Sequence, residues 1–276
     1  MTTTTRPVAA LDAERVTLAY DQRTVFQDLS LSVMEGQITT LVGANGSGKS
    51  TLLKAFGRLL SPRSGRIHLQ GKALRTIPTR QVARQLAVLP QKPLTPPATT
   101  VRELAARGRH PHQTWFRPLT SQDTAAIDAA LDATGLTGLA GRDVATLSGG
   151  QIQRAWIALV LAQQTPIALL DEPTTFLDLA HQLEILHLVR RLNRDHRTTV
   201  LMVLHDLWLA GRFSDRLIAL AGGQVVADGS PWEVLKPGVL RQAFGLEAQV
   251  VSEPVTGSPL VVPAAETVLP HDLAGS

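Results

Sequence analysis

The clearest chemical signal in the sequence is a glycine-rich segment. Residues 43–50 read GANGSGKS, which fits G-x-x-x-x-G-K-[ST], and they lie between a strand-like run (37–42) and a helical pattern from Lys49. Glycines let backbone N–H groups close around phosphate oxygens, and the start of a helix favours an anion. Lys49 adds a positive charge, and the Ser50 hydroxyl can ligate Mg²⁺. We therefore predict a nucleotide-binding loop. It comprises Gly43, Ala44, Asn45, Gly46, Ser47, Gly48, Lys49, Ser50 and Thr51.

Two carboxylates and a histidine follow short apolar runs. Asp171 and Glu172 come directly after residues 167–170, and His205 comes directly after residues 199–204. The carboxyl ends of neighbouring parallel strands form the ligand-binding edge of a sheet, so we expect these side chains near the phosphate loop. Asp171 is then predicted to face Mg²⁺ and Glu172 to polarise an attacking water. His205 is predicted to contact the terminal phosphate.

Two further candidates give weaker signals. Gln91 follows the strand-like run 86–89, and its amide could ligate Mg²⁺ or orient a water molecule. Tyr20 is the only tyrosine in the chain and ends the first strand pattern, so its ring could stack on adenine. Ordinary core packing would also explain Tyr20, and a single glutamine is weak evidence.

A second glycine-rich turn lies far along the chain from the first. It consists of Leu147, Ser148, Gly149, Gly150 and Gln151, and it precedes a helical run to about Ala162. Ser148 can cap that helix, and the glycines leave its positive end accessible to an anion. Standing alone, the motif would be an ordinary capped helix. Because one nucleotide rarely needs two such loops, we predict a dimer in which each ATP lies between one chain's phosphate loop and the other chain's turn.

The elements that must position these residues follow an α/β pattern. Continuous apolar strands alternating with helices predict a parallel sheet covered on both faces. The middle of the chain is mostly helical, with capping signals at Thr100 and Thr120, so we expect a helical insert in that sheet. The expected organisation is a domain over 11–246, made of a core at 11–91 and 166–246 and a helical subdomain at 92–165, followed by a tail of uncertain order at 247–276.

Composition narrows the possible classes of protein. The chain has no cysteine, which excludes disulfides, thiolate metal sites and cysteine nucleophiles. Its longest apolar run, Ala155–Ala162, is far shorter than the roughly 20 residues that cross a bilayer. The first residues contain no apolar core of signal-peptide length. Net charge is +4, but residues 72–118 hold nine Lys or Arg against one acid. That stretch is consistent with binding of nucleic acid, anionic lipid headgroups, a phosphate ligand or a protein partner, or simply with a solvated face.

Taken together and in this order, the motifs resemble those of ATP-binding cassette (ABC) proteins over roughly residues 15–245. The resemblance implies a P-loop NTPase, RecA-like core with an antiparallel β-subdomain and a helical subdomain. It also implies a head-to-tail dimer with two sandwiched ATP molecules. By this similarity Gln91 senses Mg²⁺ and the membrane partner, Asp178 belongs to the dimer-facing loop, and His205 holds the γ-phosphate.

Three positions depart from the usual pattern of that family. Ala44 replaces a frequent proline in the phosphate loop, Ile152 follows the second glycine turn where arginine is common, and Trp208 stands where asparagine is frequent. None of these changes removes a catalytic group. The last two bear on fine coupling and rate.

Finer features resemble a narrower group of transport ATPases. The segments RGRHPHQTWF, DEPTTFLDLAHQLEIL and VLHDLWLAGRFSDRLIAL look like those of ATPase subunits of iron–siderophore, haem and cobalamin importers, with the siderophore branch closest. This implies an ATPase on the cytoplasmic face of the plasma (inner) membrane. It would act as a homodimer with transmembrane permease subunits and, through them, a substrate-binding protein.

Alternatives remain at this point. Within the same class, the chain could serve a cobalamin or haem importer. A soluble ABC ATPase acting on nucleic acid or ribosomes would typically carry two cassettes or a coiled-coil insertion, and the basic stretch offers only Trp115 and Phe116 for base stacking. A monomeric kinase would have no use for the second glycine turn.

Overall fold

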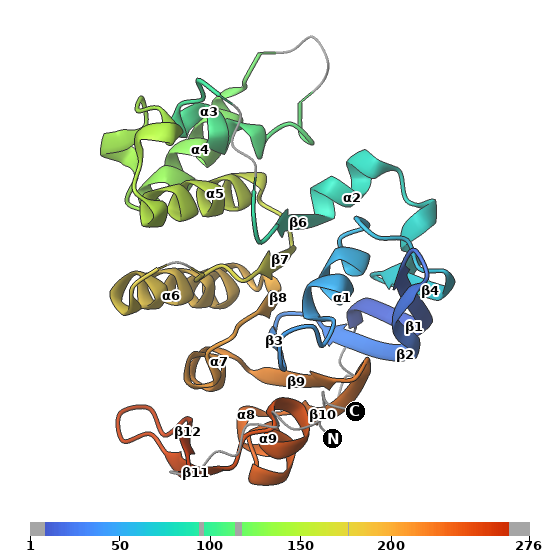
Figure 1. Cartoon of the computed structure of the whole chain (residues 1–276). Helices are drawn as coiled ribbons and strands as arrows, with labels where there is room; N and C mark the ends of the chain where they lie inside the picture. Colours follow the sequence, from blue (N-terminus) through green and yellow to red (C-terminus); the bar gives the residue numbers. More distant parts are fainter. Residues whose placement is uncertain (1–8, 94–96, 114–117, 176, 265–276) are drawn as a thin grey trace, which may run out of the picture.

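The computed structural model describes residues 9–93, 97–113, 118–175 and 177–264 (Figure 1). Trp115 and Phe116 lie outside these ranges. Within them, no helix is both long and apolar enough to cross a bilayer. The elements form a central sheet, a smaller antiparallel sheet beside it and a separate group of helices, which confirms the predicted fold class.

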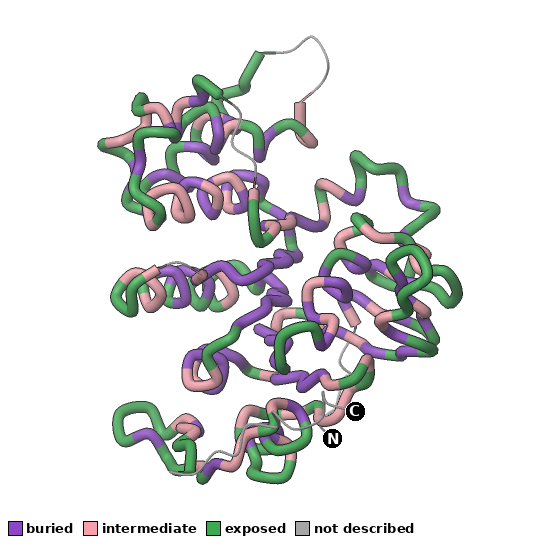
Figure 2. Tube along the Cα trace, in the orientation of Figure 1, coloured by how far each residue is buried: buried purple, intermediate pink, exposed green. Residues whose placement is uncertain are grey.

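A six-stranded, mostly parallel sheet forms the centre of the protein. Its strands, in sheet order, are β10 (Gln224–Gly229), β9 (Arg216–Ala221), β3 (Ile38–Val42), β8 (Thr199–Val203), β7 (Ile167–Asp171) and β6 (Leu86–Leu89). Every residue of β3, β7 and β8 is buried, as expected for strands covered on both faces (Figure 2). Only the β9–β10 hairpin, which turns at Gly222-Gly223, is antiparallel in this sheet.

Two hydrophobic cores cover the two faces of this sheet. One core joins it to helix α1 (Lys49–Phe56) and to the four-stranded antiparallel sheet. The strands of that second sheet, in order, are β2 (Arg23–Met34), β1 (Ala9–Tyr20), β4 (Ser64–Leu69) and β5 (Lys72–Ala73). The helices that contribute to the other core are α5 (Gly149–Gln163), α6 (Leu179–His196), α7 (Leu207–Phe213), α8 (Pro231–Val234) and α9 (Pro237–Phe244).

The first strand starts earlier than its sequence pattern indicates. The alternation of residues predicts a strand from Arg15, whereas β1 begins at Ala9, with Ala10 and Leu11 fully buried. A register shift against β2 lies between Ala13 and Val16, and Arg15 has a left-handed backbone (φ 45°). This bulge moves the buried side chains out of a strict period of two, which hides the true start of the strand.

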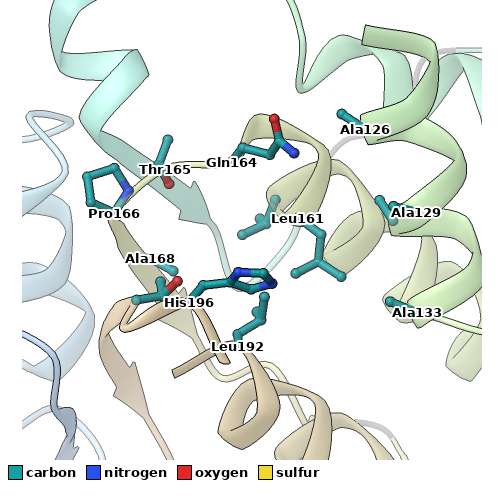
Figure 3. A pocket seen from close by; sticks show the side chains of 13 residues that line it. Ala126, Ala129, Ala133, Leu161, Gln164, Thr165, Pro166, Ala168, Leu192 and His196 are labelled. Carbon is teal, nitrogen blue, oxygen red and sulfur yellow. The ribbon is translucent and has the colours of Figure 1, made fainter. Parts of the chain in front are cut away.

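The predicted insert forms a helical subdomain with its own core. Its main helices are α3 (Val101–Arg107), α4 (Ser121–Ala133) and α5, whose buried faces meet around Leu104, Ile127 and Ala158. Thr100 and Thr120 form the capping boxes that the sequence predicts. Between this subdomain and the central sheet lies a cavity of about 460 Å³, where alanines of α4 lie opposite Leu192 and His196 of α6 (Figure 3).

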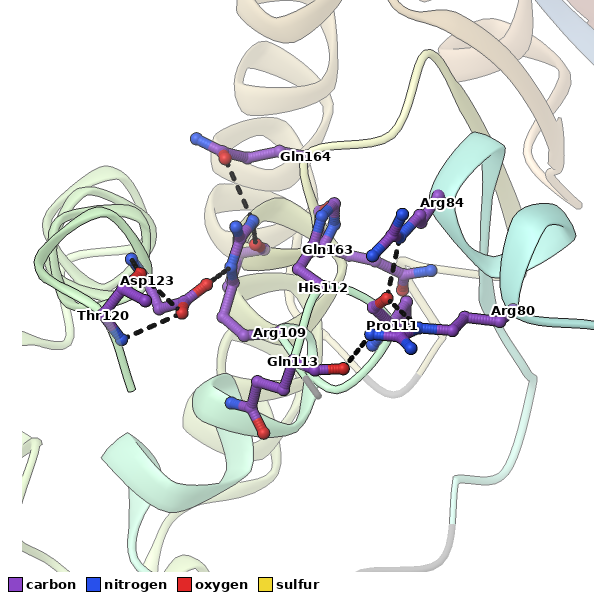
Figure 4. Close-up of polar contacts among 11 residues, drawn as sticks. Arg80, Arg84, Arg109, Pro111, His112, Gln113, Thr120, Asp123, Gln163 and Gln164 are labelled. Carbon is purple, nitrogen blue, oxygen red and sulfur yellow. Dashed lines mark hydrogen bonds and ion pairs between the residues drawn. The ribbon is translucent and has the colours of Figure 1, made fainter. Parts of the chain in front are cut away.

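A polar network joins the helices of the subdomain to one another and to α2 (Thr79–Gln85) (Figure 4). The buried Arg109 donates to Asp123 and Gln164 side chains and to the Ala162 carbonyl. Arg80 and Arg84 each donate Nε–H to the Pro111 carbonyl of the subdomain. Several positive charges in the basic stretch 72–118 therefore have partners within the chain. The number of Lys and Arg residues in this stretch is larger than the number of charges left for an external partner.

The last part of the chain contains a β-hairpin. Strands β11 (Ala248–Ser252) and β12 (Pro259–Pro263) pair antiparallel, and β12 packs against α7. Glu253 is buried in the connecting turn, where it accepts hydrogen bonds from the backbone of Val255 and Thr256. Residues 247–264, which belong to the expected tail of uncertain order, are therefore structured. Their uneven apolar pattern gives no clear period.

The ion pair between Arg109 and Asp123 yields a stability prediction. Asp123→Asn leaves the buried guanidinium without its counter-charge, so we expect unfolding free energy to fall by about 3–5 kcal/mol. Asp128→Asn removes an exposed partner of Arg102 and should cost less than about 1 kcal/mol. Urea denaturation followed by circular dichroism measures the unfolding free energy of both variants. Equal losses in the two variants would contradict a stabilising role for the buried Arg109–Asp123 pair.

The same pair predicts a pH dependence. Hydrogen bonds from Arg109 and Thr120 lower the pKa of Asp123 to about 2, against an ordinary value near 3.8. Because the folded-state pKa is depressed, this stabilisation is fully present above pH about 4 and is lost as pH falls toward 2. The stability gap between wild type and Asp123→Asn should therefore narrow over that interval.

Candidate functional site

The phosphate loop connects β3 to α1 and depends on glycines at two tight positions. A Cβ on Gly43 would lie 2.2 Å from the Leu220 carbonyl oxygen, and one on Gly48 would lie 2.5 Å from the Phe26 ring. Both backbones are also left-handed or nearly so, with φ 150° and 101°. Only glycine fits such a path, and a glycine-rich path of this kind can present backbone N–H groups to an anion.

The side chain of Lys49 folds back onto the first residues of the phosphate loop. This side chain is buried, and Nζ donates hydrogen bonds to the carbonyl oxygens of Gly43 (2.8 Å) and Ala44 (3.0 Å). Burial lowers the pKa of Lys49, while the carboxylates of Glu172 and Asp171 oppose that shift. A cation held against the loop in this way can attract the outer phosphates of a nucleotide.

Ser50 and Asp171 form a pair of oxygen donors beside the loop. The Ser50 hydroxyl donates to Oδ1 of Asp171 at 2.8 Å, and Asp171, the last residue of β7, is 1% exposed. Burial raises the pKa of Asp171, and the Ser50 hydrogen bond opposes this. A hydroxyl and a carboxylate at this distance are hard oxygen ligands of the kind that Mg²⁺ takes, so the residues fit that ion.

Glu172 has a strained backbone and three side-chain partners. Its φ of 55° lies in the left-handed region, which is costly for a residue with a Cβ and is typical of functional sites. Oε1 lies 2.6 Å from Nε2 of His205, and Oε2 accepts from Thr175 at 3.0 Å. Burial opposes ionisation of Glu172, but hydrogen bonds from His205, Gln91 and Thr175 outweigh it and lower its pKa. The result is a carboxylate that can accept a proton from water.

A cavity of about 380 Å³ brings half of the predicted site residues together. It is lined by Tyr20, Arg23, Val25, Asn45, Gly46, Gly48, Lys49, Ser50, Thr51, Gln91, Glu172 and His205. Tyr20 is 42% exposed, so it is not a core residue. Arg23 and Val25 are absent from the sequence prediction. Arg23 pairs with Tyr20 across the β1–β2 hairpin, a position that a turn at Asp21-Gln22 would have indicated.

The second glycine turn and Asp178 lie outside this cavity. Ser148 caps α5 in a capping box with Gln151, and Asp178 caps α6 by accepting from the His181 backbone at 3.0 Å. A Cβ on Gly150 would lie 3.4 Å from Leu177, so the two helix starts are neighbours. The single chain therefore presents its two glycine motifs at separate places.

The positions that depart from the usual family pattern have packing roles. Ile152 packs against the core of the helical subdomain, and Trp208 packs on the central core with the Arg212 guanidinium 5.6 Å from its ring centroid. Ala44 donates its backbone N–H to the Ala243 carbonyl. None of the three touches the Glu172 carboxylate.

Comparison with known proteins identifies the family of the chain. The family model described as ABC transporter matches residues 26–175. The chain is 46% identical to the petrobactin import ATP-binding protein of Bacillus anthracis over 254 residues, covering 92% of this chain and 93% of the relative. It is 46% identical to the ferric enterobactin transport ATP-binding protein of Escherichia coli over 263 residues, covering 95% and 97%.

A more distant relative and a solved structure extend the comparison. A cobalamin import ATP-binding protein of Halobacterium salinarum is 40% identical over 239 residues, covering 87% of this chain and 60% of the relative. The dimeric structure of a bacterial ABC transporter cassette superposes with a TM-score of 0.71 at 28% identity, covering 80% of this chain and 98% of that one. The chain belongs to the ABC transporter family, as one of its ATP-binding, ATP-hydrolysing proteins.

Proposed function

We propose that this chain is the ATP-hydrolysing subunit of a membrane importer of iron(III)–siderophore complexes. The observation that carries the proposal is the 46% identity, over more than nine-tenths of both chains, to ATP-binding proteins named for petrobactin and enterobactin transport. The cobalamin relative is less similar and is matched over a smaller part of its own length. Cobalamin or haem import is therefore the second candidate.

The proposed site residues divide the work of hydrolysis. The loop backbone and Lys49 bind the phosphates, and Tyr20 stacks on the adenine. Glu172 orients and deprotonates the attacking water, because its carboxylate is ionised and lies in the same cavity as Lys49. The bond from His205 to Glu172 must open for His205 to reach the terminal phosphate. Mg²⁺, held by Ser50, Asp171 and Gln91, would neutralise phosphate charge.

Two copies of the chain are needed to complete each site. The turn from Leu147 to Gln151 exposes the positive end of the fifteen-residue helix α5, yet it does not line its own chain's nucleotide cavity. A head-to-tail homodimer would bring this turn and Asp178 to the partner's phosphate loop. ATP would then act as the link between subunits, and its hydrolysis would release them.

The proposed assembly sits at the membrane. Since the relatives are named for import and the described part of this chain has no candidate membrane span, transmembrane permease subunits would carry the substrate. A substrate-binding protein would deliver it to them. The ATPase pair would bind the permease on the cytoplasmic face of the plasma (inner) membrane.

Hydrolysis is tested by Glu172→Gln. The amide cannot take the water's proton, so ATP turnover should fall by about 10²–10⁴-fold while ATP binding persists. Phosphate release measures turnover, and size-exclusion chromatography with ATP should show an accumulated dimer. Glu247→Gln, an exposed partner of Arg241, is the control and should hydrolyse normally. Normal turnover by Glu172→Gln would refute the assignment of this residue.

The dimer is tested by a second substitution in the Glu172→Gln background. A Cβ on Gly149 meets nothing within 4 Å, so Gly149→Arg should fold normally but obstruct a partner at this surface. We expect the double variant to bind ATP and remain monomeric. Gly138→Arg, equally open in the same subdomain, should still dimerise. A dimer that survives Gly149→Arg would exclude this turn from the interface.

The substrate is tested by uptake. A strain lacking this gene should lose growth on iron(III)–siderophore complexes as sole iron source and regain it with the wild-type gene but not with the Glu172→Gln gene. Growth on haem iron and uptake of labelled cobalamin should be unchanged. A selective loss of either of those would favour the second candidate.

A further inference from the structure

A basic cavity separate from the nucleotide site lies between the end of α1 and the β4–β5 hairpin. Its volume is about 410 Å³, within the range of small-molecule pockets. Four arginines from three segments line it: Arg58 after α1, Arg63 before β4, Arg66 in β4 and Arg75 after β5. Leu60, Ile67 and Leu74 supply apolar lining, and Ser61 and Ser64 add hydroxyl groups.

The lining holds no carboxylate to balance these charges. The sequence contains neither Asp nor Glu between Glu35 and Glu103, so no acidic residue comes from the segments that build the cavity. Among the described residues, none of the four arginines takes part in an ion pair. Glu14 and Asp28 line a neighbouring pocket together with Arg66, and neither forms an ion pair with it. Arg66 set aside, the other three arginines share one cavity whose lining holds no carboxylate.

One of the arginines is held in place by the backbone. Arg58 has a left-handed backbone (φ 59°), and its Nη1 donates to the Ile77 carbonyl at 2.7 Å. This bond ties the residue that follows the end of α1 to the segment after the β4–β5 hairpin and leaves the other guanidinium donors available. Guanidinium groups present planar pairs of N–H donors that match phosphate oxygens. Like charges gathered without a partner repel one another, and a bound anion relieves that repulsion.

We propose that the cavity formed by Arg58, Arg63 and Arg75 is a second anion-binding site, which takes a phosphate-bearing ligand. The apolar lining at Leu60 and Leu74 suits the carbon skeleton next to such a phosphate. Two sources carry this chemistry: a free phosphorylated metabolite and the headgroup of an anionic phospholipid. The site is separate from the nucleotide cavity, because the two linings share no residue.

Two binding assays on the full chain distinguish the sources. The first is calorimetric titration with pyrophosphate, without magnesium and with the nucleotide site filled beforehand with ADP. The second is co-sedimentation with phosphatidylglycerol vesicles, compared with phosphatidylcholine vesicles. The variant Arg58→Gln/Arg63→Gln/Arg75→Gln should weaken the relevant binding by at least about tenfold, because charge-assisted hydrogen bonds are lost. Arg63→Gln/Arg75→Gln keeps the Arg58 anchor and should show a smaller loss.

The control removes the same charge elsewhere. Arg102→Gln/Arg194→Gln/Arg241→Gln replaces arginines that already pair with carboxylates, so binding should stay unchanged. If the wild type binds pyrophosphate and the cavity variants do not, the ligand is a free phosphorylated molecule. If the cavity variants lose only the binding to phosphatidylglycerol vesicles, the ligand is a lipid headgroup. Absence of binding in both assays, or equal weakening by the control, would overturn the proposal. ATP turnover should persist in every case, which separates this site from the proposed hydrolysis.

Discussion

The hydrogen bond from Ser50 to Asp171 joins two segments 121 residues apart, and the site exists only because they meet. One partner stands in the first turn of α1, and the other ends β7. Their meeting requires β3 and β7 to run parallel in one sheet, with β8 between them. The buried sheet therefore has a chemical purpose, because it fixes a phosphate loop, two carboxylates and a histidine at one edge.

Much of that edge could be predicted from the sequence for a physical reason. A residue that follows a buried parallel strand can only emerge at the strand's carboxyl end, so Asp171, Glu172 and His205 were predictable from the apolar runs before them. The glycine loop was predictable because its backbone path admits few other residues. Arg23 was missed, since it enters the cavity through the β1–β2 hairpin rather than through a strand end of the central sheet.

Other features of the fold could not be predicted, because a sequence pattern shows the type of each residue but not the residue that it contacts. The bulge at Arg15 breaks the alternation of β1, so six residues of that strand were missed. The β4–β5 hairpin was also missed, although Gln70 and Gly71 both adopt the left-handed backbone of its turn. Arg109 counted as surface charge in the sequence, whereas the fold buries it against Asp123, fourteen residues away.

The side chain of Gln163, at the end of α5, has a mechanical consequence. Its Nε2 donates to the carbonyl oxygens of Ala83 and Leu86, at 2.6 and 3.3 Å, and the backbone carbonyl oxygen of Gln163 lies 2.8 Å from Nε2 of His112. The helical subdomain is thus hydrogen-bonded to the start of β6, the strand that leads to Gln91. Gln91, which lines the nucleotide cavity, is only two residues beyond the end of β6. The amide of Gln163 thus connects the helical subdomain to that cavity through a single four-residue strand.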